Sequence, residues 1–198
     1  MDTLQKFEIL VLGGPKVGKK TFLERILTDE YIGDEPYTQS LGVVSGIRES
    51  IVGGSKVSVN ITVCSGRRRH LPIVQQFYGK INGCLILYDC SAVESFKDDM
   101  VFWYNEIKRS LPTTPIYLLS TKIDVPLNLR KISEKDGTKQ AEEMSSKHFS
   151  ISSKAGTNIE RMWDSFLSDM VLVQEKALES ENASVAKLAE ENLDGSTE

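Results

Sequence analysis

The order of apolar and polar residues along the chain predicts strands that alternate with helices. Three short apolar runs are typical of buried parallel strands, and they lie at 7–12, 83–88 and 115–119. A further short strand is expected at 148–151. Because helices must cover a sheet of buried parallel strands, this order predicts an α/β fold with helices on both faces.

A second pattern, between the first two apolar runs, predicts a β-hairpin. Every second residue from Val57 to Val63 is apolar and the residues between them are polar, so the apolar side chains share one face of a strand. Gly53 and Gly54 separate this strand from another at 41–51. The hairpin adds an antiparallel edge strand to the sheet.

Helix signals fill the gaps between these strands. Helices are expected at 19–28, after His70, from Ser95, at 138–147 and from Thr157. Ser95 is followed by Asp98, and Thr157 by Glu160, at the spacing with which a hydroxyl and a carboxylate cap the start of a helix. We therefore expect both helices to begin at these hydroxyl residues.

Length, charge and cysteine content then narrow the class of protein. The 198 residues are enough for one domain with a short tail. A net charge of −4 argues against a partner that is a nucleic acid. The three cysteines are too few for a disulfide framework and indicate a reducing compartment. No apolar run reaches the ~18–20 residues of a membrane span.

Charge also separates the end of the chain from the rest. Residues 174–198 carry a net charge of −5, whereas residues 1–173 carry +1. The Ala- and Glu-rich composition of this end predicts a frayed helix that becomes disordered from Asn192 onward. We therefore divide the chain into a globular domain, 1–173, and an acidic helical or disordered tail, 174–198.

The clearest chemical signal is a glycine-rich segment between the first strand and the first helix. It consists of Gly13, Gly14, Pro15, Lys16, Val17, Gly18 and Lys19, and it matches the glycine and lysine positions of the phosphate-binding loop G-x-x-x-x-G-K-[S/T]. Glycines let successive backbone N–H groups face one anion, and the helix start adds the positive end of its dipole. Lys19 would add a full charge on the β- and γ-phosphates. A simple glycine-rich turn is the alternative interpretation.

The position after Lys19 departs from this motif. A Ser or Thr hydroxyl there would bind Mg²⁺, but the chain has Lys20. Thr21 comes one residue later, about 100° further around the helix, so we expect its hydroxyl to point away from the metal position.

Taken together, four motifs resemble those of the Ras superfamily of small GTPases, and of its Rab branch most closely. Besides the phosphate loop, they are ILYDCSAVESF at 86–96, TKID at 121–124 and SSK at 152–154. Residues 41–48 also resemble the strand after switch I. The resemblance covers about residues 6–170. It implies a Ras-like P-loop fold, with a mostly parallel six-stranded sheet and about five helices, that binds GTP or GDP.

The resemblance also implies a set of guanine-binding residues. They are Tyr31, Thr121, Lys122, Asp124, Ser152, Ser153 and Lys154. The Asp124 carboxylate can accept hydrogen bonds from guanine N1–H and the 2-amino group, a pair of donors that adenine lacks. Lys122 is expected along the base, Tyr31 beside it, and Ser153 and Lys154 at its O6 and face.

On the phosphate side, the resemblance reveals replacements. Val63 stands where the family has an aspartate that holds Mg²⁺, and Arg67 stands where it has the glutamine that orients the attacking water. Gly66 keeps a backbone N–H for the γ-phosphate. We therefore assign no catalytic residue and no metal ligand, and the need for Mg²⁺ stays open.

The remaining phosphate contacts come from two further places. Lys20 and Thr21 extend the phosphate-binding set beyond Lys19. Switch I would contribute a hydroxyl from Thr38 or Ser40.

Two explanations of the replaced residues stay open. In the first, cations around the phosphates take over the charge of the metal, with Lys20 as the main substitute and Lys16, Lys19 and Arg67 beside it. Val63 then removes a carboxylate that would compete for Lys20. In the second, the site has drifted because it is no longer used.

Three functions are compatible with this sequence. The first is a Rab-like small GTPase of vesicle traffic with weak or absent GTP hydrolysis. The second is a pseudo-GTPase scaffold that acts through protein contacts. The third is a protein that occupies the regulators of another GTPase through the basic segment 67–70, unless this segment is only a solvated loop. The tail contains no cysteine, so we expect no prenyl anchor and a cytoplasmic protein that a partner can recruit to membranes.

Overall fold

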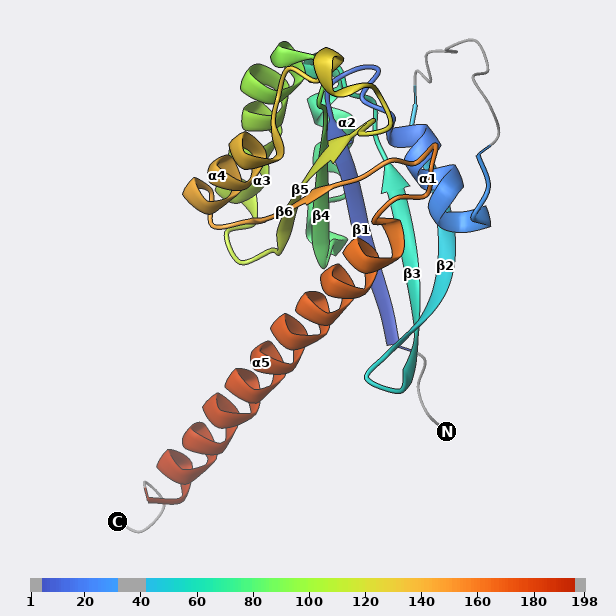
Figure 1. Cartoon of the computed structure of the whole chain (residues 1–198). Coiled ribbons are helices and arrows are strands. Elements are labelled where there is room, and N and C mark those ends of the chain that lie inside the picture. The colour runs from blue at the N-terminus through green and yellow to red at the C-terminus, as the bar shows by residue number, and fades with distance from the viewer. Residues whose placement is uncertain (1–4, 32–41, 195–198) are drawn as a thin grey trace.

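The computed structural model describes residues 5–31 and 42–194, and their strands form a single six-stranded sheet (Figure 1). The strands are β1 (Gln5–Gly13), β2 (Val44–Val52), β3 (Ser55–Val63), β4 (Gly83–Asp89), β5 (Ile116–Thr121) and β6 (Lys147–Ser150). They lie in the order β2-β3-β1-β4-β5-β6. Only β2 is antiparallel to its neighbour. The predicted mostly parallel sheet with an antiparallel edge strand is confirmed.

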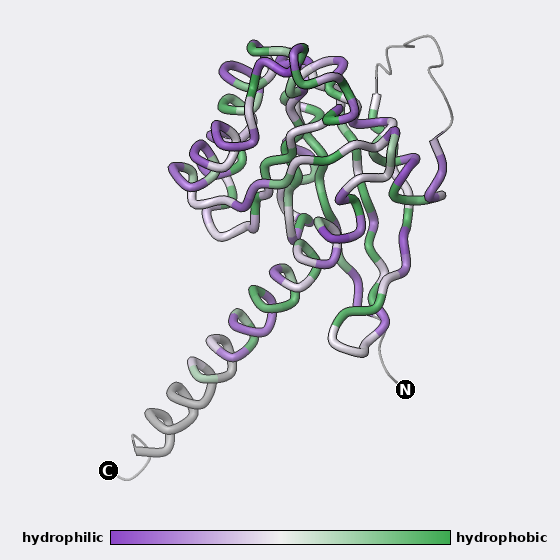
Figure 2. Tube along the Cα trace, viewed as in Figure 1, coloured by the Kyte–Doolittle hydropathy of each residue, from purple (hydrophilic) through white to green (hydrophobic). Residues whose placement is uncertain are grey.

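The helices divide between the two faces of the sheet. They are α1 (Lys19–Thr28), α2 (Leu71–Gln75), α3 (Val101–Ser110), α4 (Glu134–Glu143) and α5 (Ile159–Asp194). Side chains of β1 alternate between two hydrophobic clusters because successive residues of a strand face opposite ways. Phe7, Ile9 and Val11 pack with α1 and α5, whereas Leu10 and Leu12 pack with α2, α3 and α4. Hydrophobic positions follow the strands, and hydrophilic ones lie on the outer helices (Figure 2).

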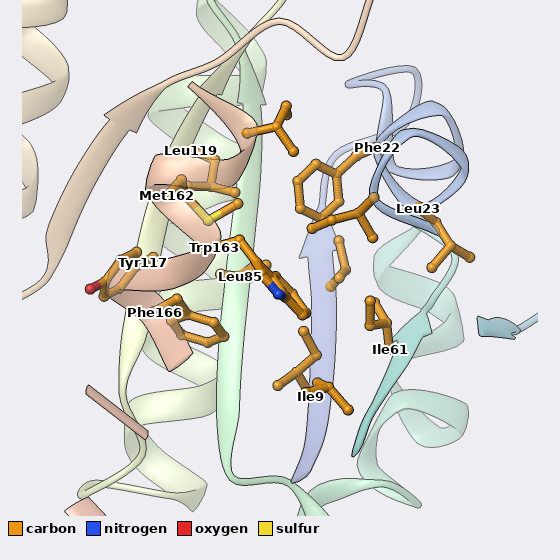
Figure 3. Packing of buried hydrophobic residues seen from close by; sticks show 14 of the residues in the cluster. Ile9, Phe22, Leu23, Ile61, Leu85, Tyr117, Leu119, Met162, Trp163 and Phe166 are labelled. Atoms are coloured by element: carbon orange, nitrogen blue, oxygen red, sulfur yellow. The ribbon is translucent and has the colours of Figure 1, made fainter. Parts of the chain in front are cut away.

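Trp163 fastens α5 to the hairpin side of the sheet. Its ring is 1% exposed and lies between α5, α1 and the sheet, with Phe22 and Ile9 nearby (Figure 3). The indole N–H donates to the Ser50 hydroxyl of β2 at 3.0 Å. Arg48 of β2 lies 5.3 Å from the centre of the same ring. An aromatic side chain of this size contributes strongly through the apolar area it buries, so this contact holds the edge strand in place.

Three predicted helix starts differ from the observed ones. Helix α5 begins at Ile159, two residues after the expected Thr157. Helix α4 begins at Glu134 rather than at 138, because Ser133 caps it: the Ser133 hydroxyl accepts from the Asp136 N–H at 3.1 Å. The expected cap formed by Ser95 and Asp98 is wrong. The Ser95 hydroxyl is buried and accepts from the backbone N–H of Asp89 at 3.0 Å, so it serves the end of β4 instead.

A π-helix, Ser95–Met100, takes the place of that cap and leads into α3. Such helices close i→i+5 hydrogen bonds and are rare, and they are frequent at functional sites.

Helix α5 has 36 residues and is the longest element. Its first turns bury Met162, Phe166 and Met170, whereas Leu172 and Leu178 are each 52% exposed, and the later turns project away from the sheet (Figure 1). The predicted disorder from Asn192 is wrong for 192–194, which are helical, and 195–198 lie outside the described residues. Despite this length, no helix in the described ranges has an apolar stretch that could cross a bilayer.

Beneath α4, a half-buried histidine creates a pH-sensitive contact. The Nε2 atom of His148 lies 2.8 Å from the Tyr88 hydroxyl oxygen. Gly137 of α4 packs so closely over both side chains that a Cβ there would collide with them. Burial lowers the pKa of His148 from 6.5 to about 4, since the enclosed imidazolium loses its hydration.

We therefore predict that acid weakens the fold through His148. The unfolded chain takes up this proton near pH 6.5 and the folded chain only near pH 4, so stability is lost as the pH falls through this range. Between pH 7 and pH 5, His148 should lower the free energy of unfolding by about 2 kcal/mol. The variant His148→Gln cannot titrate and should lack this part of the fall in urea denaturation. An equal fall in both proteins would contradict the prediction.

Candidate nucleotide-binding site

The loop between β1 and α1 has the curled backbone that an anion-binding loop needs. Gly18 precedes α1 with a φ of 92°, and Lys16 has a φ of 63°. A left-handed backbone is uncommon for a lysine. It is held here because the Lys16 carbonyl accepts a hydrogen bond from the Lys122 ammonium at 2.8 Å. Gly13, with a φ of 134°, lies so close to the Leu87 carbonyl of β4 that no Cβ fits.

Lys19 is buried beneath this loop. Lys19 is 9% exposed, and its ammonium donates hydrogen bonds to the carbonyls of Gly13 at 2.9 Å and Gly14 at 2.6 Å. An ammonium has three donors, so these two bonds leave one for a phosphate oxygen. Burial lowers the pKa of Lys19 from 10.5 to about 8, and the attraction of Asp99 partly opposes this shift. Lys19 is therefore still mostly charged at neutral pH.

Beside the loop lies a pocket of about 190 Å³. Its lining residues are Val17, Gly18, Thr21, Tyr31, Thr121, Lys122, Asp124, Ser153 and Lys154. They come from the phosphate loop, α1 and the segment that follows it, the end of β5 and the segment that follows it, and the segment after β6. The structure thus brings the predicted phosphate-binding and guanine-binding segments to one cavity. Thr21 lines this cavity, on the side of the guanine motifs.

The Asp124 carboxylate is oriented by Ser152. The Ser152 hydroxyl donates to Asp124 Oδ1 at 2.6 Å and accepts from the Ala155 N–H at 3.0 Å. Ser152 itself is fully buried, so it supports the pocket and does not line it. Among the residues that the structure describes, no protein group bonds to the second oxygen of Asp124, which leaves it as an acceptor for a ligand.

An ion pair with Asp89 positions Lys122, which lines the pocket. The ammonium of Lys122 lies 2.6 Å from Asp89 Oδ2 at the end of β4. Burial opposes ionisation of Asp89, but hydrogen bonds from Lys122 and Ser91 outweigh it and lower the pKa of the carboxyl. The Thr121 hydroxyl lies 2.8 Å from the Val17 carbonyl, so β5 and the phosphate loop are joined directly.

Arg25 joins α1 to the segment after β6. Its Nε donates to the Ser153 carbonyl at 2.7 Å and a terminal nitrogen donates to the Lys154 carbonyl at 2.8 Å. The Lys154 ammonium lies 5.7 Å from the centre of the Tyr31 ring. Sequence reasoning missed Arg25 and Asp89. Asp89 lies in the ILYDCSAVESF motif at 86–96, but that motif gave no sign of its ion pair with Lys122, and Arg25 gave no signal beyond its position in a helix.

Gly66, which follows β3, packs against the phosphate loop. A Cβ on Gly66 would lie 2.5 Å from the Gly13 carbonyl oxygen and 2.5 Å from the Gly14 carbonyl carbon. The segment after β3 therefore meets the same two peptide groups that Lys19 contacts.

The groups at the metal positions do not fit Mg²⁺. Val63 is 5% exposed within the hydrophobic cluster that includes α1, and its side chain is a hydrocarbon. Lys20 carries a cation, and its side chain is 59% exposed and lies 3.6 Å from Glu24. Within 5–31 and 42–194, no three His, Cys, Asp or Glu side chains are grouped so as to hold a metal. The switch I candidates, Thr38 and Ser40, lie outside the described residues.

The basic segment forms a short 3-10 helix, Arg68–His70, preceded by Arg67. Arg68 pairs with Asp99 of the π-helix at 3.3 Å, and its guanidinium lies 4.6 Å from the centre of the Phe102 ring. Arg69 donates from Nε to His70 Nε2 at 3.3 Å. Arg68 is therefore packed on the π-helix and the start of α3, which differs from a fully solvated loop.

We predict that Gly66 cannot carry a side chain without moving. The variant Gly66→Ala must push its segment away from Gly13 and Gly14, because both contacts are to backbone. The free energy of unfolding should fall by about 1–3 kcal/mol, the usual cost of overpacking. Gly79→Ala is the matched control, since a Cβ there meets nothing within 4 Å. Urea denaturation of both variants is the measurement, and equal stabilities would contradict the packing.

Comparison with known proteins shows the family of this chain. The model of the Ras family matches residues 8–172. The plant Ras-related protein RABA2c of Arabidopsis thaliana is 25% identical over 184 residues, which are 92% of this chain and 83% of the relative. RABD1 of the same plant is 28% identical over 155 residues, 78% of this chain and 74% of the relative.

A mammalian relative is similar to the same extent. The Ras-related protein Rab-13 of Canis lupus familiaris is 26% identical over 167 residues, which are 84% of this chain and 80% of the relative. The family match covers the strands, the phosphate loop and the guanine motifs described above. The chain therefore belongs to the Ras family of small GTPases, and it resembles the Rab proteins within that family.

Proposed function

We propose that this protein is a Rab-like guanine-nucleotide-binding protein of intracellular vesicle traffic, in which GTP hydrolysis is weak or absent. One observation carries the nucleotide part of the proposal: the phosphate loop and Asp124 meet at the same pocket. The traffic part follows from the resemblance to Rab proteins.

The pocket residues divide the work of holding the nucleotide. Asp124, oriented by Ser152, accepts hydrogen bonds from the base and selects guanine over adenine. Lys122, held by Asp89, keeps the phosphate loop in its curled shape through the Lys16 carbonyl. Lys19 offers its remaining N–H to a phosphate oxygen. When bound, the nucleotide supplies the phosphate anion that Lys19 neutralises.

Charge compensation without a metal is the feature that sets this site apart. Lys20 follows Lys19 directly, and its surface pair with Glu24 is of the exposed kind that contributes little, so Lys20 can exchange Glu24 for a phosphate at small cost. Position 63 carries a hydrocarbon and no carboxylate, so this residue does not compete for Lys20. We propose that Lys20 supplies much of the charge that a magnesium ion would bring.

A pseudo-GTPase scaffold is the second candidate. The observation that favours it is the buried hydrocarbon of Val63 together with Arg67 at the position of the water-orienting residue. In this function the nucleotide, or the empty pocket, stabilises a surface for other proteins and no turnover occurs. The two candidates differ in whether the bound nucleotide changes over time.

Titration of the nucleotide-free protein with GDP, GTP and ATP tests the first candidate. We expect GDP and GTP to bind at least ~100-fold more tightly than ATP, because only guanine matches Asp124. The variant Asp124→Ala should weaken GDP binding about 100-fold, while Asp164→Ala, an exposed position on α5, should leave it unchanged. No binding at roughly millimolar nucleotide would contradict the proposal and favour the scaffold.

Removal of Mg²⁺ tests the role of Lys20. We expect the affinity of the wild-type protein for GDP to be the same in Mg²⁺ and in EDTA, within about twofold. The double variant Lys20→Ser with Val63→Asp restores a hydroxyl and a carboxylate, so its binding should become about tenfold weaker in EDTA. Wild-type binding that is lost in EDTA, or a folded double variant that stays indifferent to Mg²⁺, would contradict the substitution.

A further inference from the structure

The π-helix places a carboxylate beside the phosphate loop. If Gly14 carried a Cβ, that atom would collide with the Asp99 carboxylate and would lie 3.0 Å from its Cγ and 3.1 Å from its Cβ. The side chain of Asp99 is 23% exposed. A partly buried charge is screened less than a surface charge, so Asp99 acts on its neighbours with more than surface strength.

Asp99 acts on the same cation that serves the phosphates. It is the main charge that raises the pKa of Lys19 against the effect of burial. Cys64, the other group that raises it, is itself a neutral thiol at pH 7 because burial raises its pKa to about 12. A carboxylate that attracts the Lys19 ammonium repels an anion bound to that ammonium, because the anion lies only one hydrogen bond away from it.

Arg68 compensates part of this negative charge. It lies 3.3 Å from Asp99 and packs against Phe102. While Arg68 is bound to Asp99, it is also withheld from a phosphate. The uncompensated part of the Asp99 charge and the engagement of Arg68 in this ion pair both disfavour additional negative charge beside the phosphate loop.

We propose that Asp99 is a specificity-determining residue that makes the pocket prefer a nucleoside diphosphate over the corresponding triphosphate. This inference rests on the proposed guanine-nucleotide function and adds a preference between its two ligands. The triphosphate has one more phosphate and more negative charge next to Lys19, so repulsion by Asp99 weakens it more than it weakens the diphosphate. Neither Val63 nor Lys20 can ligate a magnesium ion that would offset this difference in charge.

The ratio of the affinities for GTP and GDP tests this proposal. Asp99→Asn should raise the affinity for GTP relative to GDP about tenfold, equivalent to about 1.4 kcal/mol. Asp98→Asn, the neighbouring exposed carboxylate on the same π-helix, should leave the ratio within about twofold of wild type.

A second pair of variants distinguishes an electrostatic role of Asp99 from a structural role of its ion pair with Arg68. Arg68→Gln breaks the same ion pair but leaves Asp99 uncompensated, so the relative affinity for GTP should fall about threefold. Arg69→Gln removes the same charge from the next residue and serves as its control. If Asp99 only anchored the segment after Gly66, both variants would break that anchor and shift the ratio in the same direction.

The pH profile of GDP binding gives an independent readout. Lys19 has a pKa of about 8 in the free protein, so GDP affinity should fall above this pH as the ammonium is lost. Asp99→Asn removes the attraction that supports this pKa, and the fall should begin at lower pH than in wild type. An unchanged profile would contradict the coupling between Asp99 and Lys19.

These outcomes separate the preference set by Asp99 from nucleotide binding itself. GDP binding by the wild-type protein with an unchanged GTP to GDP ratio in Asp99→Asn overturns the inference alone. A shift of the ratio in the same direction in Asp99→Asn and Arg68→Gln also overturns it. Absence of nucleotide binding in both wild type and Asp99→Asn overturns the proposed function and the inference together.

Discussion

The site depends on one buried cation. Lys19 has given up most of its hydration, and two peptide carbonyls replace only part of it, which is why its pKa lies near 8 rather than 10.5. A buried ammonium needs negative charge close by; Asp99 supplies part of it, and the phosphate of the proposed nucleotide ligand would supply more. The curled phosphate loop, the close approach of Gly66 and the position of the π-helix all serve to surround this one atom.

Neighbouring ion pairs and caps turn a flexible set of loops into a shaped pocket. Lys122 joins Asp89 to the Lys16 carbonyl, and Arg25 joins α1 to the carbonyls after β6. Each of these charged groups contacts backbone of a different segment, so the loops hold one another in register. These contacts join the described walls of the pocket to one another, and such preorganisation lowers the ordering cost of binding.

Much of this could be predicted from the sequence, because local patterns determine local structure. The apolar runs specified the strands, the alternation from Val57 to Val63 specified the hairpin, and the motifs marked the loops that meet at the pocket. The start of α4 was misplaced because apolar spacing is weak there, and Ser133 with Asp136 carried the signal instead. The roles of Arg25, Asp89 and Asp99 could not be predicted, since each depends on a contact between segments distant in the sequence.

Helix α5 sets a fixed distance between the pocket beside the phosphate loop and Asp194, where the helix ends. Gln174 still contacts the sheet domain through the side chain of Gln5, and the helix then continues without interruption to Asp194. At 1.5 Å per residue, this extension is about 30 Å long. A flexible linker of the same length would allow every separation from contact to full extension. A helix allows essentially one separation. A molecule that binds the acidic end of α5 would therefore hold the pocket at a fixed distance and orientation, as a rigid spacer does.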